Sequence, residues 1–231
     1  MNPGDRYALE TALRIKESSP VNVQVSVISL APAASLPVIR EALAMGADRA
    51  LLISDPAAEG ADMLATGRLL ARALSRVAPD IVFFGPQGED SNGGMLCAAV
   101  ADRLQFPVLS QAVEVTVEHE SQRSFAKVKR QTEHGYDVIG APLPCAIGVA
   151  GAINEPRYAS VKGKISAGSK PIDLLTLDDL GFEQEASGAD GSGTKVLSIG
   201  EPPRRGETVV VEGHEGAAER IADFLSSKAL L

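Results

Sequence analysis

Short apolar segments alternate with amphipathic segments of helical period through the first hundred residues. The apolar segments carry the valine, isoleucine and phenylalanine typical of buried strands. They are residues 21–30, 50–53 and 81–84, and the helical segments between and after them are residues 35–45, 60–78 and 92–104. Strands joined through helices by short links form parallel sheets with right-handed crossovers. We therefore predict an α/β fold with a doubly wound, mostly parallel sheet.

The chain begins with a helix, although a doubly wound domain normally begins with a strand. Asn2 is a favourable N-cap, and Pro3 suits the first helical position because its missing N–H has no partner there anyway. Two alternatives stay open. Either another chain contributes the first strand, or the domain is built with one strand fewer.

The pattern changes after Pro107. Residues 108–118 and 124–139 alternate polar and apolar side chains, with a turn near residues 119–123. This alternation predicts an antiparallel hairpin added to the sheet. Residues 145–150 are apolar and small, which predicts a buried strand that returns to the core.

From Asn154 onward the periodicity is lost. Residues 185–194 have the composition of a flexible linker. Residues 213–228 form an amphipathic helix in this interpretation. Because an isolated helix of that length is marginal in water, it needs a parent domain or a partner subunit to pack on.

Composition excludes several classes of function. The net charge of −8 argues against a nucleic-acid partner, which would select a basic face. The sequence has no apolar run near the ~20 residues that span a membrane. Residues 1–10 lack a signal-peptide pattern. Cys97 and Cys145 lie in apolar surroundings and indicate buried thiols in a reducing compartment. We expect a cytoplasmic protein without membrane insertion.

No catalytic or metal-binding set emerges from spacing. His119, His134 and His214 share no ligand spacing, so we interpret all three as solvated. Lys127, Lys129 and Arg130 alternate along one predicted hairpin strand. They are either a solvated face or the partners of a neighbouring subunit's acids.

The strongest candidate for a ligand site follows the strand at residues 81–84. The loop contains Gly85, Gln87, Asp90, Asn92, Gly93, Gly94 and Met95, and a helix comes after it. Glycines let backbone N–H groups approach a ligand, and a helix N-terminus favours phosphate. Leu30 would line the same sheet edge, and Asn2 could reach it. The alternative is that all these residues form turns and caps.

The run Asn154, Glu155, Pro156, Arg157 and Tyr158 is the most unusual in the chain. Pro156 restricts the residue before it to extended geometry. Arg and Tyr are enriched at binding hot spots, so we interpret this run as a docking surface.

INEPRY followed by KPI is a specific signature, and further segments match the same pattern. The matching segments are residues 1–17, 39–50, 79–90, 127–130, 143–160 and 170–181. On these residues the sequence resembles the β subunit of electron-transfer flavoproteins, almost from end to end. The loop differs from the family pattern at Pro86, Asn92 and Met95, which stand where Lys, Asp and Gln are usual.

The resemblance implies a non-catalytic partner in a heterodimer. An α subunit would hold most of an FAD, and the pair would carry electrons from a flavin dehydrogenase to a downstream acceptor, as in fatty acid oxidation. Residues 1–160 would form an adenine-nucleotide α-hydrolase-like domain with its first strand missing. Residues 161–231 would form a recognition loop and a C-terminal arm that packs on the partner subunit.

The resemblance also assigns site residues. AMP, or a second FAD in some members, would contact Asn2, Leu30 and the loop from Gly85 to Met95. Val161 would be the apolar anchor of the recognition loop. Two alternatives stay open: a degenerate structural or regulatory partner that binds no nucleotide, and a stand-alone ATP-dependent enzyme, although the sequence lacks an evident catalytic pair.

Overall fold

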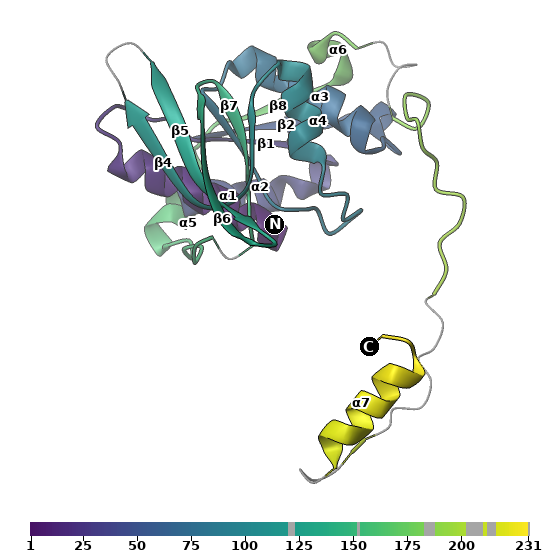
Figure 1. Cartoon of the computed structure of the whole chain (residues 1–231). Coiled ribbons are helices and arrows are strands. Elements are labelled where there is room, and N and C mark those ends of the chain that lie inside the picture. Colours follow the sequence, from purple (N-terminus) through teal and green to yellow (C-terminus); the bar gives the residue numbers. More distant parts are fainter. Residues whose placement is uncertain (120–122, 152, 183–187, 202–209, 212–215, 231) are drawn as a thin grey trace. The chain divides into compact units, whose positions relative to one another are not determined.

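The computed structural model describes every residue except 120–122, 152, 183–187, 202–209, 212–215 and 231 (Figure 1). The chain divides into two compact units, Met1–Lys195 and Val196–Leu231. Unit 1 is a mixed α/β domain that contains parallel strands, as predicted. The sequence placed a functional boundary after residue 160, whereas residues 161–195 belong to unit 1 because their helices and strand pack there.

The strands of unit 1 form two sheets. A three-stranded parallel sheet has the order β1-β2-β8, and a five-stranded sheet has the order β3-β7-β4-β5-β6. In the second sheet β3, β7 and β4 are parallel, and β4, β5 and β6 are antiparallel. The bounds are β1 Ser26–Leu30, β2 Arg49–Ile53, β3 Ile81–Phe84, β4 Val108–His119, β5 Ser124–Thr132, β6 Gly135–Pro142, β7 Cys145–Val149 and β8 Ile172–Leu175.

The helices cover both sides of the parallel strands (Figure 1). α1, α2 and α5 share one apolar cluster with Val27 of β1, and α3, α4 and α6 share another with Ile28. Neighbouring residues of a strand point to opposite faces, so this arrangement is doubly wound. The bounds are α1 Pro3–Ser18, α2 Leu36–Met45, α3 Met63–Val77, α4 Leu96–Leu104, α5 Val161–Ala167 and α6 Leu177–Leu180, with short 3₁₀ turns at Ala33–Ser35 and Pro56–Ala58.

The expected single sheet is divided between β1 and β3. Among the described strands, β1 pairs only with β2, and β3 pairs only with β7. Side chains of both strands, such as Leu30 and Phe84, nevertheless pack on the same cluster around α3. The sheet is divided because no described strand is hydrogen-bonded to both β1 and β3. The expectation of one continuous sheet is wrong for this reason.

The predicted hairpin is a three-stranded antiparallel extension. Its second strand is interrupted at Glu133-His134, and Gly135 adopts φ +135°, which an L side chain rarely tolerates. The turn therefore divides the predicted strand 124–139 into β5 and β6. The sequence analysis predicted two strands instead of three because it did not recognise this turn.

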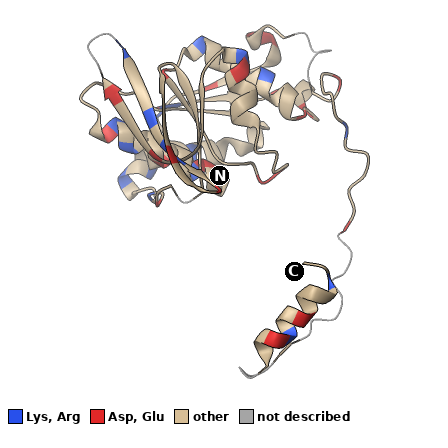
Figure 2. Ribbon diagram, in the orientation of Figure 1, with Lys and Arg blue, Asp and Glu red and all other residues tan. Residues whose placement is uncertain are grey.

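Cross-strand pairs account for the basic stripe on β5. Lys127 binds Glu118 of β4 at 2.8 Å, and Arg130 binds Asp137 of β6 at 2.8 Å. The ammonium group of Lys129 lies 4.5 Å from the centroid of the Tyr136 ring. Figure 2 shows basic and acidic residues interspersed along the ribbon of unit 1. These charges are partnered within the sheet.

Residues 161–180 return to the core instead of leaving it. β8 adds to β2 in parallel, and Leu177 and Leu180 of α6 are buried. Thr176 and Asp179 form a capping box that starts α6. The lost periodicity after Asn154 therefore reflects very short elements.

Part of the expected linker is fixed. The Asp62 carboxylate caps α3 and also accepts hydrogen bonds from the backbone N–H groups of Gly193, at 2.8 Å, and Thr194, at 3.0 Å. The Ser192 hydroxyl accepts from the Asp62 N–H at 2.8 Å. Composition predicted flexibility in this segment, but an aspartate 130 positions away binds it. Residues 185–187 of the predicted linker lie outside the described residues.

Unit 2 contains the predicted C-terminal helix. α7 spans Ala217–Ser227, and none of its side chains is buried. Residues 213–215 of the predicted helix lie outside the described part of the chain. In the part that is described, no helix is both long and apolar enough to cross a membrane.

Candidate functional site

The loop after β3 packs against the first turn of α1. The Asn2 side-chain amide donates to the Gln87 carbonyl at 2.9 Å. A Cβ on Gly85 would lie 2.6 Å from Asp5 Oδ1 and 2.8 Å from the Gly4 carbonyl carbon. The structure thus brings Asn2, Gly85 and Gln87 together as predicted. These contacts join the first turn of α1 to the loop. A side chain at residue 85 would collide with α1, so a glycine is needed there for the two to pack closely.

Burial affects the acid beside this contact. Burial raises the pKa of Asp5, against hydrogen bonds from Asn2 and the Gly85 backbone that act to lower it. The Asp5 side chain, on the first turn of α1, therefore packs against the loop.

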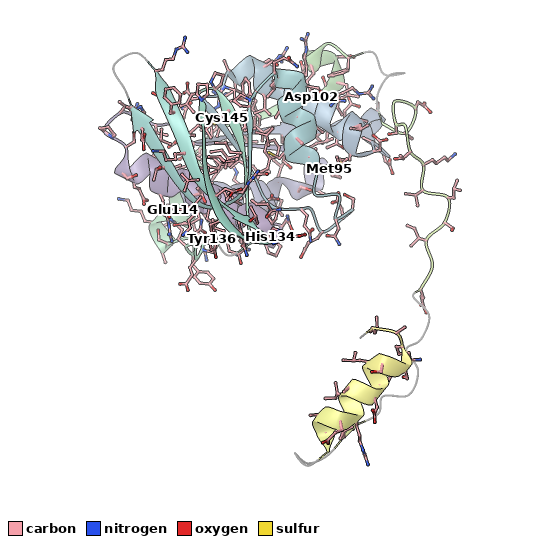
Figure 3. The ribbon with its side chains drawn as sticks, in the orientation of Figure 1. Met95, Asp102, Glu114, His134, Tyr136 and Cys145 are labelled. Atoms are coloured by element: carbon pink, nitrogen blue, oxygen red, sulfur yellow. The ribbon has the colours of Figure 1, made fainter. Side chains whose placement is uncertain are left out.

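The second half of the loop is exposed and leads into α4. The Asp90 carboxylate accepts from the Ser91 N–H at 2.7 Å, and the Asn92 N–H donates to the Gly88 carbonyl at 2.9 Å. Gly93 is exposed, and Gly94 has φ +63°, a left-handed conformation that suits glycine. Figure 3 shows Met95 at the loop end of α4.

The N-terminus of α4 has no side-chain cap. Met95 is the N-cap residue, makes no capping hydrogen bond and is 60% exposed. The first backbone N–H groups of a helix need a partner, and a phosphate supplies one. Leu30 packs on the same apolar cluster as Leu96 at the start of α4. The uncapped start of α4 and the glycines before it therefore fit a phosphate group, while Leu30 is shown only to pack on the apolar cluster that Leu96 also contacts.

The run from Asn154 to Tyr158 lies along α1, far from this loop in sequence. The Arg157 guanidinium binds both carboxylate oxygens of Glu10, at 2.7 and 3.1 Å, and both of Glu17. Glu10 is only 3% exposed. The hydrogen bonds that Arg157 donates to Glu17 and Glu10 raise the pKa of Arg157 further above its usual value. Arg157 therefore joins this run to α1.

Asn154 and Glu155 are bound to the same helix. The Asn154 amide donates to the Tyr7 carbonyl at 3.0 Å and to the Thr11 hydroxyl at 2.8 Å. The Glu155 carbonyl accepts from Arg14 at 3.2 Å. Sequence reasoning grouped Asn154 and Arg157 with contact residues, while the structure gives both of them partners within the chain.

Three exposed side chains of this region are large and hydrophobic. Tyr158 is 92% exposed, and Val161 and Ile165 of α5 are each 76% exposed. Ser160 caps α5 by accepting from the Gly163 N–H at 3.0 Å. We call Tyr158, Val161 and Ile165 the apolar patch. Ile165 was missed by sequence reasoning, although its i, i+4 spacing from Val161 on a helix could have indicated it.

The described residues hold no cluster of His, Cys, Asp or Glu suited to a metal ion. Burial raises the pKa of Cys97 to about 12 and that of Cys145 to about 11, and both thiols are free. Thiols with such pKa values are protonated at neutral pH and unreactive. His119 contacts Ser124 at 2.9 Å on the exposed end of β4, and His214 lies outside the described residues.

Comparison with known proteins decides the family. The model of the electron transfer flavoprotein domain matches residues 1–180. The chain belongs to the electron transfer flavoprotein family. Subunit CarD of the caffeyl-CoA reductase-Etf complex from Acetobacterium woodii is 37% identical over 229 residues, which are 99% of this chain and 85% of that protein.

Other family members carry the name of one subunit. The electron transfer flavoprotein subunit beta of Thermoanaerobacterium thermosaccharolyticum is 34% identical over 100% of this chain and 87% of its own length. That of Methylophilus methylotrophus is 35% identical over 92% of this chain and 80% of its own. The chain is accordingly a β subunit of an electron transfer flavoprotein, a non-catalytic electron carrier. Neither the stand-alone enzyme nor the degenerate partner is favoured.

Proposed function

We propose that this β subunit forms a heterodimer with an α subunit that holds most of an FAD. The pair carries electrons from a flavin dehydrogenase to a downstream acceptor. The observation that carries this proposal is the apolar patch, because three large exposed side chains lie on a segment that ion pairs hold firmly to α1. Rigid apolar side chains surrounded by polar ones are typical of protein docking sites.

The bound flavin supplies the electron chemistry, and residues of this chain position the electron donor relative to the heterodimer. Tyr158 and Val161 bind the donor dehydrogenase. The family resemblance and the composition support a cytoplasmic complex that serves dehydrogenases such as those of fatty acid oxidation. α7, with no buried side chain of its own, packs on the α subunit.

The Val161→Asp variant tests the docking role. A charge at the centre of an apolar contact has to be desolvated, so we expect the rate of flavin reduction by an acyl-CoA dehydrogenase to fall about tenfold at low donor concentration. Val161 is exposed, so the melting temperature and association with the α subunit stay unchanged. Val21→Asp, an equally drastic change at another exposed valine, is the control. Equal rates in the two variants would remove Val161 from the docking site.

A nucleotide phosphate, most simply that of AMP, binds at the N-terminus of α4 in this proposal. The first backbone N–H groups of α4 donate to the phosphate, Gly93, Gly94 and Met95 lie against it, and Asn2, Gln87, Asp90 and Asn92 hold the loop in shape. The Met95→Asp variant separates a ligand site from a simple cap. An aspartate N-cap stabilises a helix by about 1 kcal/mol and repels phosphate.

We expect heat-denatured wild-type heterodimer and Met95→Leu to release a nucleotide detectable by mass spectrometry, and Met95→Asp to release none while melting at the same or a higher temperature. Nucleotide retained in full by Met95→Asp contradicts this site.

A further inference from the structure

We infer that Arg157 is a positioning residue for electron-donor docking, acting through Glu10 and Glu17 to fix the apolar patch. We call these three residues the Arg157 clasp. The inference rests on the proposed docking function and reassigns Arg157 from contacting the donor to holding the residues that do. The mobility of the segment around Arg157 can be measured separately from electron transfer.

The donors of Arg157 are already engaged. Nε and Nη2 donate to Glu10, and Nη1 and Nη2 donate to Glu17. The Arg157 backbone N–H also donates to Glu10, at 3.3 Å. A guanidinium used on two carboxylates has little capacity left for a partner protein. This geometry therefore favours a positioning role for Arg157 over the direct contact that its place in the sequence suggested.

The burial of Glu10 fixes the position of Arg157. Glu10 lies on the face of α1 that also buries Leu9 and Leu13. An unpaired carboxylate at such a position is strongly unfavourable. Arg14 binds only Oε1 of Glu10, at 2.8 Å, so Oε2 depends on Arg157. The helix therefore holds the Arg157 backbone at one place.

The apolar patch follows within a few residues. Tyr158 is adjacent to Arg157, and Ser160 caps α5, from which Val161 and Ile165 project. Fixing Arg157 thus sets where Tyr158 emerges and where α5 begins. Docking to a segment ordered in advance avoids the loss of conformational entropy on binding.

The other end of the segment is held independently. The Lys170 ammonium donates to the carbonyls of Leu43 and Ala47, at 2.9 and 2.6 Å, and Arg40 donates to that of Ala167 at 2.6 Å. Weakening the clasp therefore loosens the segment at Tyr158 and leaves α5 attached to α2. The domain remains folded, so the positioning role can be isolated.

Arg157→Lys is the decisive variant. Lysine keeps the charge that neutralises Glu10, but its single ammonium cannot reproduce the planar fork that bridges two carboxylates. Arg130→Lys is the matched control, because Arg130 pairs with one acid, Asp137, on a different surface. Both are made in the heterodimer, alone and with Glu155→Cys carrying a nitroxide spin label, because the exposed Glu155 side chain lies two residues before Arg157 in the segment that the clasp holds. The raised pKa values of Cys97 and Cys145 direct the thiol reagent to the new cysteine.

Two measurements follow. Electron paramagnetic resonance of the label reports mobility of the segment. Steady-state reduction of the flavin by an acyl-CoA dehydrogenase, supplied with its acyl-CoA, gives KM and kcat for the donor. We expect Arg157→Lys to narrow the lines of the label spectrum, because the label becomes more mobile. We expect it also to raise the KM for the donor about tenfold with kcat unchanged. Arg130→Lys should match the wild type in both measurements.

Each other result has a meaning. An unchanged spectrum with a raised KM would show that Arg157 touches the donor directly, and an unchanged spectrum with an unchanged KM would show a purely structural pair; both overturn the inference. A narrowed spectrum with an unchanged KM also overturns it. If the wild-type heterodimer accepts no electrons, the proposed donor is wrong, and a narrowed spectrum still supports the clasp.

Discussion

Individual residues show where composition misleads. Arg and Tyr stand side by side in the sequence and together suggested a binding surface, yet Arg157 points to two acids of α1 while Tyr158 is free. The partners of Arg157 are 140 and 147 positions away, so no local pattern could assign them. The proximity of Asn2 to the loop agrees with the prediction that the start of the first helix could reach it, since the Asn2 amide donates to the Gln87 carbonyl.

Glu10 gives the protein an acid-sensitive contact. Burial acts to raise the pKa of Glu10, but hydrogen bonds from Arg157 and Arg14 outweigh it, and the pKa lies below its usual value. A carboxyl with a lowered folded-state pKa contributes stability above its unfolded pKa, ~4.3, and loses that contribution as the pH falls through the folded value.

We therefore expect Glu10→Gln to lower the free energy of unfolding by about 2 kcal/mol at pH 7. The difference from the wild type shrinks below about pH 4. Urea titrations from pH 7 to pH 3 measure it. A difference that grows on acidification would contradict a lowered pKa for Glu10.

At the scale of elements, long periodic segments were predictable and very short ones were not. α3 repeats its apolar side chains over 15 residues, and β7 is buried throughout. β8 and α6 have four residues each, too few to show a period. β8 is also an edge strand whose Leu174 faces solvent, so it lacks the apolar run of a central strand.

A pair of leucines tests whether residues 172–180 belong to the core. Leu177 is fully buried against α3, and Leu174 is exposed. We expect Leu177→Ala to lower the free energy of unfolding by about 3 kcal/mol and Leu174→Ala by less than about 0.5 kcal/mol. Denaturant titration compares them. Similar losses would mean that α6 does not pack as described.

The segment around Gly193 depends on one side chain. Hydrogen bonds from the Ala65 backbone and from Thr194 and Gly193 hold the pKa of Asp62 below its usual value. Asp62→Ala removes these contacts, so we expect trypsin to cleave faster after Lys195, which follows the segment directly. Thr194→Val keeps the Asp62 backbone contacts and is the control. Equal cleavage of Asp62→Ala and the wild type would show that the segment is held by other means.

At the scale of the whole molecule, the main difference from expectation is that the sheet is divided in two. The alternation of strands and helices predicted one sheet, but it could not show that β1 and β3 each have an unpaired edge among the described strands. Residues of β1 are all half-buried, whereas β7 is buried throughout. The apolar cluster around α3 nevertheless accepts side chains from both sheets.

Unpaired edges predict uneven protection of backbone amides. In native-state hydrogen exchange of the chain we expect amides of β1 and β3 to exchange about tenfold or more faster than those of β2 and β7, because each of the latter is paired on both sides. Nuclear magnetic resonance resolves the four strands. Equal protection would show that the edges of β1 and β3 are covered in solution.

Tyr158 gives the protein a natural optical reporter. The chain has no Trp and three Tyr, and the other two are engaged elsewhere: Tyr7 lies within α1, and the Tyr136 ring lies under Lys129. An iodide ion in solution reaches the Tyr158 ring without hindrance. Its ultraviolet emission is therefore the one most open to quenching, and covering the apolar patch would shield it without any attached label.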